Sequence, residues 1–363
     1  MKILFDHQKF SIQKYGGITR YFCELMMNFS TDHQYELSVL LSDNYYLKEN
    51  YSSFRKRDIL PEREVLGKSY IKQKIYSLNR AYSRRCIQSE DYDVFHPTYY
   101  DTYFLDILKK PYVITVHDLI HFRFNEKFLE NKRESDRMGK VIRGAARIIA
   151  ISESTKSDIV ELLQIDPTEI DVIYHGFNEN YTKTSPDTSS EFILFVGERH
   201  TYKNFNFFIK AISSLLHREK SLRLICVGPP FTREENLLLQ KLKLTEQVKS
   251  VRVSNEELNN LYASALVFVF PSLYEGFGMP ILEAFSNDCP VCLSNNSSFP
   301  EIAAEAALYF DPRNLESILA TVESMVYDSE LAQKKVKAGR ERLKSFSWKN
   351  TASKTFTTYS KVI

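Results

Sequence analysis

Short, fully apolar runs alternate along this chain with longer segments in which apolar residues recur every three or four positions. The clearest run covers residues 266–270 and reads Leu-Val-Phe-Val-Phe. A run of this length without polar residues is typical of a strand buried on both faces of a parallel sheet. After it, glycines and a proline lead into a segment with Ile281, Leu282 and Phe285 on one helical face. The pattern therefore predicts a strand, a glycine-containing loop and a helix.

The same alternation of strands and helices occurs twice. Strands are expected at residues 2–6, 36–41, 94–96, 112–116, 147–151 and 170–174, and again at 192–196, 222–227, 248–253, 266–270 and 307–312. This order indicates an α/β protein with parallel sheets. Because 363 residues exceed the usual size of one hydrophobic core, we expect two domains. They are residues 1–177 and 191–345, with a polar linker at 178–190 and a last helical segment at 346–363.

The loop after the 266–270 strand carries candidate binding chemistry. Its residues are Glu275, Gly276, Phe277, Gly278 and Met279, and Glu283 follows in the helix. The glycines let the backbone turn sharply and approach a ligand, and a helix start offers free amide groups to a phosphate or to hydroxyls. Pro280 suits the first position of that helix, and Glu283 is expected in its first turn.

The two carboxylates of this loop suggest what is bound. Glu275 and Glu283 are poor ligands for phosphate but good acceptors for the vicinal hydroxyls of a sugar or a ribose. The alternative is that Glu283 only complements a helix dipole and Glu275 is a solvated loop charge. Both glycines and Pro280 in the same string favour the binding interpretation.

Two cations follow the strand at 192–196. Arg199 and Lys203 are four positions apart and precede a helical segment containing Phe205, Phe208 and Ile209. Cations at a strand-to-helix junction can neutralise a diphosphate; plain surface solvation is the alternative.

Polar residues also follow two expected strands of the first domain. Gly16 and Gly17 precede a helical pattern, where an anionic diphosphate can approach the amides, although a glycine pair is also compatible with a simple turn. His117 and Asp118 come directly after the apolar strand 112–116. Because α/β proteins place site residues at the carboxyl ends of parallel strands, His117 and Asp118 are candidate site residues.

Composition narrows the class of protein. A net charge of +2 gives no indication of a nucleic-acid partner. Five scattered cysteines, an odd number, favour reduced thiols and a cytoplasmic setting. The first residues reach Asp6 too early for the core of a signal peptide, and no apolar run approaches 18 residues. We therefore expect a cytoplasmic protein whose contact with a membrane is at most peripheral.

One segment is unusually basic. From Arg55 to Arg85 there are ten lysines and arginines and three acids, with Tyr70, Ile75, Leu78 and Tyr82 interleaved. One interpretation is a patch that contacts anionic lipid or an acceptor with a diphosphate-lipid group. The other is a solvated helix face with a tyrosine-rich inner side.

Two further motifs are set aside. Asp91-Tyr92-Asp93 has the spelling of a metal-binding D-x-D, but it directly precedes an expected strand, so a turn is favoured. Cys289 and Cys292 form a C-x-x-C that enters a strand rather than opening a helix and lacks a second cysteine pair, which disfavours a redox or zinc role.

The candidate motifs together resemble one family. The string from Glu275 to Glu283 is similar to the E-x7-E segment of retaining, nucleotide-sugar-dependent glycosyltransferases of family four, also called group one. Residues 199–203 resemble that family's R-x3-K pair, residues 115–119 its H-D element, residues 16–17 its glycine loop, and residues 175–178 its inter-lobe crossover. The resemblance implies the GT-B fold: two Rossmann-like lobes, with the helix at 346–363 crossing back to the first.

The resemblance also implies roles. The catalytic residues would be His117, Glu275, Arg199 and Lys203. The donor would be bound by Gly16, Gly17, Arg199, Lys203, Glu275, Gly276, Phe277, Gly278, Met279 and Glu283, with Glu275 on the sugar hydroxyls and Glu283 on the ribose. His117 and Asp118 would line the acceptor side. No metal and no cofactor are expected, because the nucleoside-diphosphate sugar is a substrate.

The expected reaction is transfer of a hexose to a glycan or lipid-linked acceptor in surface polysaccharide synthesis. Family members usually show a glycine near residues 248–257, which this chain lacks, so the nucleotide stays open among GDP, UDP, dTDP and ADP. Two alternatives remain at this point: a nucleotide-sugar epimerase on the same fold, and a non-catalytic protein that binds nucleotide sugar or acts as a scaffold.

Overall fold

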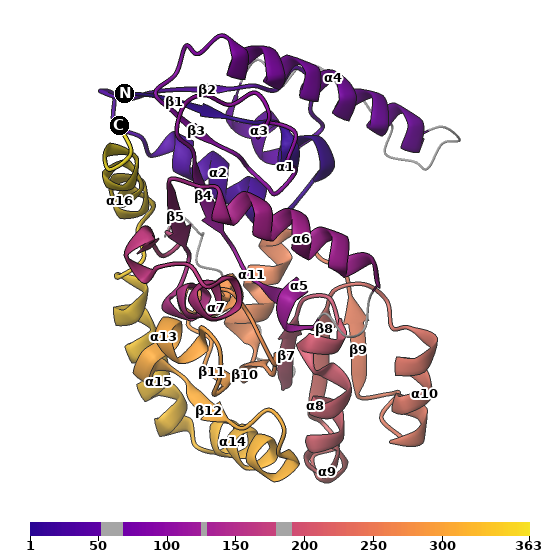
Figure 1. Cartoon of the computed structure of the whole chain (residues 1–363). Helices are drawn as coiled ribbons and strands as arrows, with labels where there is room; N and C mark the ends of the chain where they lie inside the picture. The colour runs from indigo at the N-terminus through magenta and orange to yellow at the C-terminus, as the bar shows by residue number, and fades with distance from the viewer. Residues whose placement is uncertain (52–67, 125–128, 179–190) are drawn as a thin grey trace. The chain divides into compact units, whose positions relative to one another are not determined.

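The computed structural model describes residues 1–51, 68–124, 129–178 and 191–363. The chain forms two compact units (Figure 1). Unit 1 consists of Met1–Gly176 together with Ser347–Ile363, and unit 2 consists of Phe177–Phe346. The chain therefore leaves unit 1 and later returns to it. The linker expected at 178–190 lies, except for its first residue, outside the described residues.

Unit 1 contains a parallel sheet in two parts, ordered β2-β1-β3 and β4-β5-β6. An isolated parallel bridge between Phe95 and Tyr112 connects the parts. The strands are β1 (Lys2–Phe5), β2 (Gln34–Leu37), β3 (Val94–His96), β4 (Val113–Val116), β5 (Arg147–Ala150) and β6 (Ile170–Val172). The strand expected at 36–41 is shifted toward the N-terminus, and Leu40 and Leu41 are exposed loop residues whose amides bond to the Asn79 side chain.

The helices of unit 1 follow its strands. They are α1 (Gln8–Ile12), α2 (Gly17–Met27), α3 (Tyr45–Asn50), α4 (Lys68–Gln88), α5 (Ile120–Arg123), α6 (Leu129–Arg143), α7 (Glu153–Leu163) and α16 (Trp348–Ser360). The short helix α1 occupies a segment for which the sequence predicted only a polar loop. It packs on α4, while α16 packs on α2 and β5.

The C-terminal helix α16 is held in unit 1 by specific hydrogen bonds. Thr351 donates from Oγ1 to the Tyr174 carbonyl at 2.8 Å. The Tyr359 hydroxyl and the Nδ1 atom of His96 lie 2.6 Å apart, and Thr115 Oγ1 lies 3.0 Å from the other ring nitrogen of His96. The helix predicted to cross back to the first lobe therefore does so, and burial lowers the pKa of His96 to about 3, so its ring is neutral at pH 7.

Unit 2 contains a six-stranded parallel sheet in the order β12-β11-β10-β7-β8-β9. The strands are β7 (Phe192–Val196), β8 (Arg223–Val227), β9 (Val248–Val251), β10 (Val267–Phe270), β11 (Val291–Ser294) and β12 (Leu308–Phe310). The helices are α8 (Phe205–Ala211), α9 (Ser213–Arg218), α10 (Arg233–Lys241), α11 (Asn255–Ser264), α12 (Met279–Ser286), α13 (Phe299–Ala303), α14 (Leu315–Tyr327) and α15 (Ser329–Leu343).

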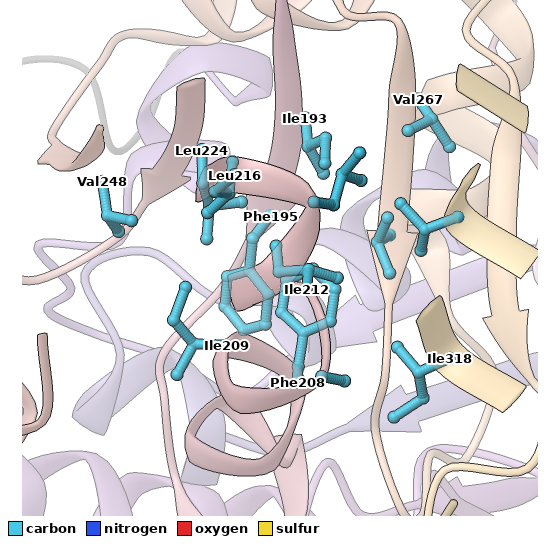
Figure 2. Packing of buried hydrophobic residues seen from close by; sticks show 14 of the residues in the cluster. Ile193, Phe195, Phe208, Ile209, Ile212, Leu216, Leu224, Val248, Val267 and Ile318 are labelled. Atoms are coloured by element: carbon cyan, nitrogen blue, oxygen red, sulfur yellow. The ribbon is translucent and has the colours of Figure 1, made fainter. Parts of the chain in front are cut away.

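The core of unit 2 explains why these strands read as unbroken apolar runs. Figure 2 shows Ile193 and Phe195 of β7 among Phe208, Ile209 and Ile212. All five side chains are buried. Burying side chains of this size contributes roughly 1.5–3 kcal/mol each.

The strand order of each unit has one switch point. In unit 2 the strands after β7 extend one way through β8 and β9 and the other way through β10, β11 and β12, so the switch lies between β7 and β10. In unit 1 it lies between β1 and β3. The loops at the carboxyl ends of the strands diverge at such a point and leave a crevice, where α/β proteins bind ligands. The two switch points therefore locate the candidate sites.

The basic segment is described only in part, because residues 55–67 lie outside the described ranges. The rest belongs to α4. Its buried positions include Ile75, Asn79 and Ser83, whereas Tyr70 and Leu78 are 61% and 53% exposed. The expectation of a tyrosine-rich inner side is therefore wrong for Tyr70. Within the described ranges, no helix combines the length and the apolar character needed to cross a membrane.

Candidate functional site

The loops after β7 and β10 meet at the switch point of unit 2, because these strands are neighbours in the sheet. Lys203, in the 3₁₀ turn after β7, donates to Oε1 of Glu275, in the loop after β10, at 2.5 Å. The two side chains are 14% and 13% exposed. The Leu273 amide also donates to the Tyr202 carbonyl at 2.7 Å, which joins the same loops. The structure thus brings together the predicted diphosphate cation and the predicted sugar acid.

The Arg199 side chain is buried, so the alternative of plain surface solvation does not hold for it. Its Nε donates to Oε1 of Glu235 at 2.8 Å, and its Nη2 donates to the Pro229 carbonyl at 2.6 Å. The guanidinium also lies 4.6 Å from the centre of the Phe231 ring, and the side chain is only 2% exposed. Its Nη1 atom is buried and has no hydrogen-bond partner among the described residues. Arg199 is therefore a fixed cation with one unused donor direction.

Sequence reasoning missed Glu235. Its Oε2 accepts from the Thr232 amide at 2.7 Å, while the Glu235 amide donates to Thr232 Oγ1, which makes a capping box at the start of α10. The T-x-x-E spacing signals that helix start, and only the structure shows that the same carboxylate also reaches Arg199.

The glycine loop after β10 turns where Gly278 has a φ of 100°. A Cβ atom there would lie 2.9 Å from Cδ1 of Ile281, so glycine is required both for conformation and for space. Helix α12 begins at Met279, which places Pro280 at its second position and Glu283 in its second turn. The expectations that Pro280 is the first helical residue and that Glu283 lies in the first turn are therefore each wrong by about one position.

Two serines hold this loop from outside the predicted motif. Ser297 Oγ accepts from the Glu275 amide at 3.0 Å and donates to the Glu275 carbonyl at 3.1 Å. Ser298 Oγ donates to the carbonyls of Glu275 and Phe277, both at 3.0 Å. Adjacent serines before a helix usually indicate only a cap, so no sequence signal linked them to the site.

Glu283 of α12 contacts α11. Its Oε2 accepts from the hydroxyl of the fully buried Tyr262 at 3.3 Å. The predicted role of Glu283 on a ribose stays a prediction.

A pocket of about 420 Å³ opens at the carboxyl ends of β11 and β12, beside the Glu275 loop. It is lined by Leu273, Asn295, Asn296, Asp311, Pro312 and Arg313. Asn296 connects it to the loop, since its Nδ2 donates to the Leu273 carbonyl at 2.9 Å. None of the lining residues was predicted as a site residue.

In unit 1, His117 directly follows β4. Its ring packs against Tyr21 with centroids 5.1 Å apart, and it stacks on His175 at 5.8 Å. Burial, together with the neighbouring cation of Lys9 and the histidines, holds the pKa of His117 well below its usual value. Its Nε2 atom is buried and has no hydrogen-bond partner among the described residues. His117 is therefore a neutral imidazole with one unused ring nitrogen.

The other predicted residues of unit 1, the glycine pair and Asp118, lie at the starts of helices. Helix α2 begins at Gly17 with Gly16 as its N-cap, so the prediction that the glycine pair opens a helix is confirmed. A Cβ at Gly17 would meet no atom within 4 Å. Asp118 Oδ1 accepts from the Ile120 amide at 3.1 Å at the start of α5. The donor and acceptor roles of these residues stay predictions.

Lys9 was not singled out from the sequence. It lies in α1, after β1, is only 9% exposed, and holds its ammonium 3.3 Å from the centre of the Tyr99 ring. Burial lowers its pKa to about 8 despite the opposing charges of Glu134 and Asp118. A lysine within a polar segment gave no signal of burial, because the pattern there predicted a loop.

The motifs that were set aside have structural roles. Asp93 accepts from the Lys2 amide at 2.7 Å and Asp91 pairs with the Lys2 ammonium at 2.8 Å. The thiols of Cys289 and Cys292 are buried, which raises their pKa, and none of the five cysteines, all within the described ranges, is in a disulfide. Among the described residues, no group of three or more His, Cys, Asp or Glu side chains is arranged to hold a metal ion.

This fold and these motifs define a class of protein. The family model for "Glycosyltransferase Family 4" matches residues 15–181, and the model for "Glycosyl transferases group 1" matches residues 177–342. Together they cover residues 15–342. The chain belongs to the glycosyltransferases that combine these two domains, as the resemblance of its motifs implied.

Individual relatives agree with this assignment. O-antigen chain mannosyltransferase B of Escherichia coli is 28% identical in an alignment of 274 positions that covers 68% of this chain and 69% of that protein. O-antigen chain mannosyltransferase RfbU of Salmonella typhimurium is 26% identical over 213 residues, 58% of this chain and 60% of that protein. Anabaena HepE, solved in complex with UDP-glucose, matches at a TM-score of 0.75 with 18% identity over 99% of this chain and 100% of that one. The fold is GT-B, as predicted.

Proposed function

We propose that this protein is a retaining glycosyltransferase that transfers a hexose from a nucleoside-diphosphate sugar to a glycan or lipid-linked acceptor in surface polysaccharide synthesis. The proposal is carried by the grouping at the β7–β10 switch point, where Lys203 meets Glu275 beside the glycine loop. The unused Nη1 donor of Arg199 adds a second cation to the same end of the sheet. The names of the two O-antigen relatives favour mannose as the transferred sugar. The epimerase alternative gains no support from these relatives.

In the proposed reaction, an acceptor hydroxyl oxygen bonds to the anomeric carbon of the donor. The bond from that carbon to the diphosphate oxygen breaks, and its electron pair leaves with the nucleoside diphosphate, which also takes the hydroxyl proton. Lys203 and Arg199 stabilise the developing charge of the leaving group, and fixed charges of this kind supply much of the rate enhancement in transferases. The neutral His117 offers its unused ring nitrogen to a sugar hydroxyl. Retention of configuration and independence of metal rest on the resemblance of the Glu275–Glu283 segment.

The first test is thermal unfolding of the full chain with GDP, UDP, dTDP or ADP. A diphosphate at a hundred times its Kd stabilises the folded state by about 2.7 kcal/mol, so the preferred nucleotide should stand out. The mannose derivative of that nucleotide should then release its nucleoside diphosphate even in the presence of EDTA. The NMR signal of the anomeric proton in the glycosylated product should show the same configuration as in the donor. Absence of any shift, together with absence of release, would refute the proposal.

We also propose that α4 contacts anionic lipid. Tyr70, Ile71 and Leu78 are exposed along this helix, and the Lys74 ammonium lies 4.6 Å from the Tyr70 ring centre. Exposed apolar side chains between cations suit the interface of an anionic membrane. Sedimentation with phosphatidylglycerol vesicles should carry the protein down, and the double substitution Tyr70→Ser with Leu78→Ser should abolish this. Equal sedimentation with phosphatidylcholine vesicles would contradict the electrostatic part of the proposal.

A further inference from the structure

The switch point of unit 1 holds a buried cation that the proposed donor site does not use. Lys9 follows β1 and Tyr99 follows β3, the two strands that flank this switch. The Lys9 amide donates to Thr98 Oγ1 at 3.2 Å, which fixes the backbone, and its ammonium lies over the Tyr99 ring. Within the described part of the chain, the Lys9 ammonium has neither an ion pair nor a hydrogen bond. Its three donors are therefore available at the place where an α/β unit binds ligands.

Two carboxylates interact electrostatically with this ammonium without pairing with it. Glu134 of α6 and Asp118 after β4 are close enough to raise the pKa of Lys9, although neither forms an ion pair with it. The Tyr99 hydroxyl donates to Glu134 Oε1 at 3.4 Å. The cation of Lys9 in turn lowers the pKa of His117, whose Nε2 has no partner among the described residues. The Lys9 cation, the Tyr99 ring beneath it and the Glu134 carboxylate bonded to the Tyr99 hydroxyl therefore lie together, and Asp118 and His117 interact electrostatically with this cation.

The sum of these charges decides which ligand fits. One lysine and two carboxylates leave the cluster with one net negative charge, which opposes the approach of a phosphate. An uncharged sugar can bridge the gaps, because each hydroxyl donates one hydrogen bond and accepts others. Its C–H face can also pack on an aromatic ring, as apolar surfaces do.

A purely structural role explains the buried charge of Lys9 less well than ligand binding does. An ammonium buried without a paired anion costs free energy, and an uncharged side chain of similar length, such as methionine, would fill the same space without that cost. The cation–π contact with Tyr99 offsets only part of that cost. A ligand that completes the hydrogen bonds of the ammonium accounts for a charge at this position.

We propose that Lys9, Tyr99 and Glu134 form the acceptor subsite and bind the hydroxyls of an uncharged hexose residue rather than a phosphate group. This inference rests on the proposed function, in which unit 2 holds the cations and acids assigned to the donor, Arg199, Lys203, Glu275 and Glu283, and unit 1 adds only the glycine pair at residues 16–17. Lys9 binds the acceptor directly, and Glu134 accepts from the sugar while it orients the Tyr99 ring.

The test is saturation-transfer NMR on the full chain with methyl α-glycosides of mannose, glucose, galactose and rhamnose at millimolar concentration. At least one glycoside should receive saturation from the wild-type protein. Lys9→Met should weaken this binding at least tenfold, and Glu134→Gln about fivefold. Lys14→Met is the matched control, because Lys14 is an exposed lysine of the same segment that also lies near a tyrosine ring, and it should bind as the wild type does. Fluorescence of Trp348, the single tryptophan and part of unit 1, checks that each variant is folded.

Kinetics separate acceptor binding from donor binding. With saturating donor and varied glycoside, Lys9→Met should raise the KM for the glycoside at least tenfold. With varied donor at a fixed glycoside concentration, it should leave the KM for the donor unchanged. The inference is overturned if no glycoside binds, if a folded Lys9→Met variant binds as well as the wild type, if inorganic phosphate or pyrophosphate displaces the glycoside, or if the donor KM rises instead. Thermal shifts by nucleoside diphosphates report the donor site separately. Glycoside binding that depends on Lys9, without binding of any diphosphate, would refute the proposed function but not the sugar subsite.

Discussion

Both units place polar side chains at a switch point of a parallel sheet, but the cations are paired with acids in unit 2 and the groups are neutral or lack an ion pair in unit 1. In unit 2 the cations are already paired, Arg199 with Glu235 and Lys203 with Glu275. In unit 1 the rings of His96 and His117 are neutral, and Lys9 has no ion-pair partner within the described ranges. Paired charges can exchange partners when a charged ligand arrives, whereas a crevice of mostly neutral groups suits an uncharged ligand. The comparison predicts that a diphosphate binds at unit 2 and a sugar at unit 1.

The largest expected effect comes from the exchangeable pair of unit 2. Glu275→Gln should lower the transfer rate by about 10³-fold, because a positioned charged group at the reacting sugar contributes on that scale. Diphosphate binding should be retained, since Lys203 keeps its charge. The rate of diphosphate release and the thermal shift measure the two quantities. Glu198→Gln, an exposed acid of the loop after β7, serves as the control and should keep full activity.

The second effect concerns the more buried of the two pairs of unit 2, Arg199 with Glu235. Glu235→Ala should lower the free energy of unfolding of unit 2 by about 3 kcal/mol, because it leaves the Arg199 charge buried without its partner. Glu234→Ala, one residue earlier and exposed, should change it by less than about 0.5 kcal/mol. Urea unfolding followed by circular dichroism measures the loss. A simultaneous shift of the Trp348 fluorescence transition would show that the effect is not confined to unit 2.

A third measurement tests whether Lys203 exchanges partners. Lys203→Met should raise the Kd for the preferred nucleoside diphosphate about 30-fold, which corresponds to about 2 kcal/mol for one charge-assisted contact. Lys210→Met, an exposed lysine of α8, is the matched control. Isothermal titration gives both values. An unchanged Kd would mean that Lys203 stays bound to Glu275 and does not contact the ligand.

Because the buried histidines of unit 1 are neutral, we expect its free energy of unfolding to fall in acid. Burial lowers the pKa of His96 and of His175 from 6.5 to about 3. Below pH 6.5 these histidines bind protons in the unfolded chain but not in the folded protein. Their neutral burial therefore leaves the free energy of unfolding undiminished above pH 6.5 and lowers it as the pH falls toward 3. At pH 5 the loss should be about 2 kcal/mol per histidine. The urea midpoint of Trp348 fluorescence at pH 7.5 and pH 5 measures it, and His96→Gln should flatten the dependence, whereas His200→Gln, at an exposed site, should not.

The smallest effect concerns the cost of Lys9 itself. Because its pKa in the folded protein is about 8 instead of 10.5, the unfolded chain binds that proton more tightly, and the penalty is present in full below pH 8. Lys9→Met should therefore stabilise unit 1 by about 1 kcal/mol at pH 7, after loss of the Tyr99 contact is included. The difference from the wild type should shrink between pH 8 and pH 10.5. A destabilised variant at pH 7 would show that the ammonium contributes to the fold.

Much of this arrangement could be predicted from local sequence, because the strands of a parallel sheet are unbroken apolar runs and their ends carry the site residues. The Lys203–Glu275 contact could be expected once both loops were assigned to the same sheet edge. Glu235 and Lys9 could not, because they depend on packing. Glu235 reads as a helix cap, and Lys9 reads as a loop lysine until α1 and Tyr99 enclose it. The register of α12 was also beyond sequence alone, since Gly278 could equally precede a helix that begins at Pro280.

The chain passes through unit 1 twice, before and after unit 2, and this order affects how the protein folds during translation. Unit 2 is an insertion within unit 1, because Phe177–Phe346 lie between the parts that make up the other unit. The Phe177 amide donates to the Phe346 carbonyl at 3.3 Å, so the two ends of the insertion close on each other. During translation all of unit 2 leaves the ribosome before α16, whose Tyr359 bonds to His96. The surfaces of α2 and β5 that bind α16 therefore stay uncovered in nascent unit 1 until the end of synthesis, whereas unit 2 can already complete its sheet.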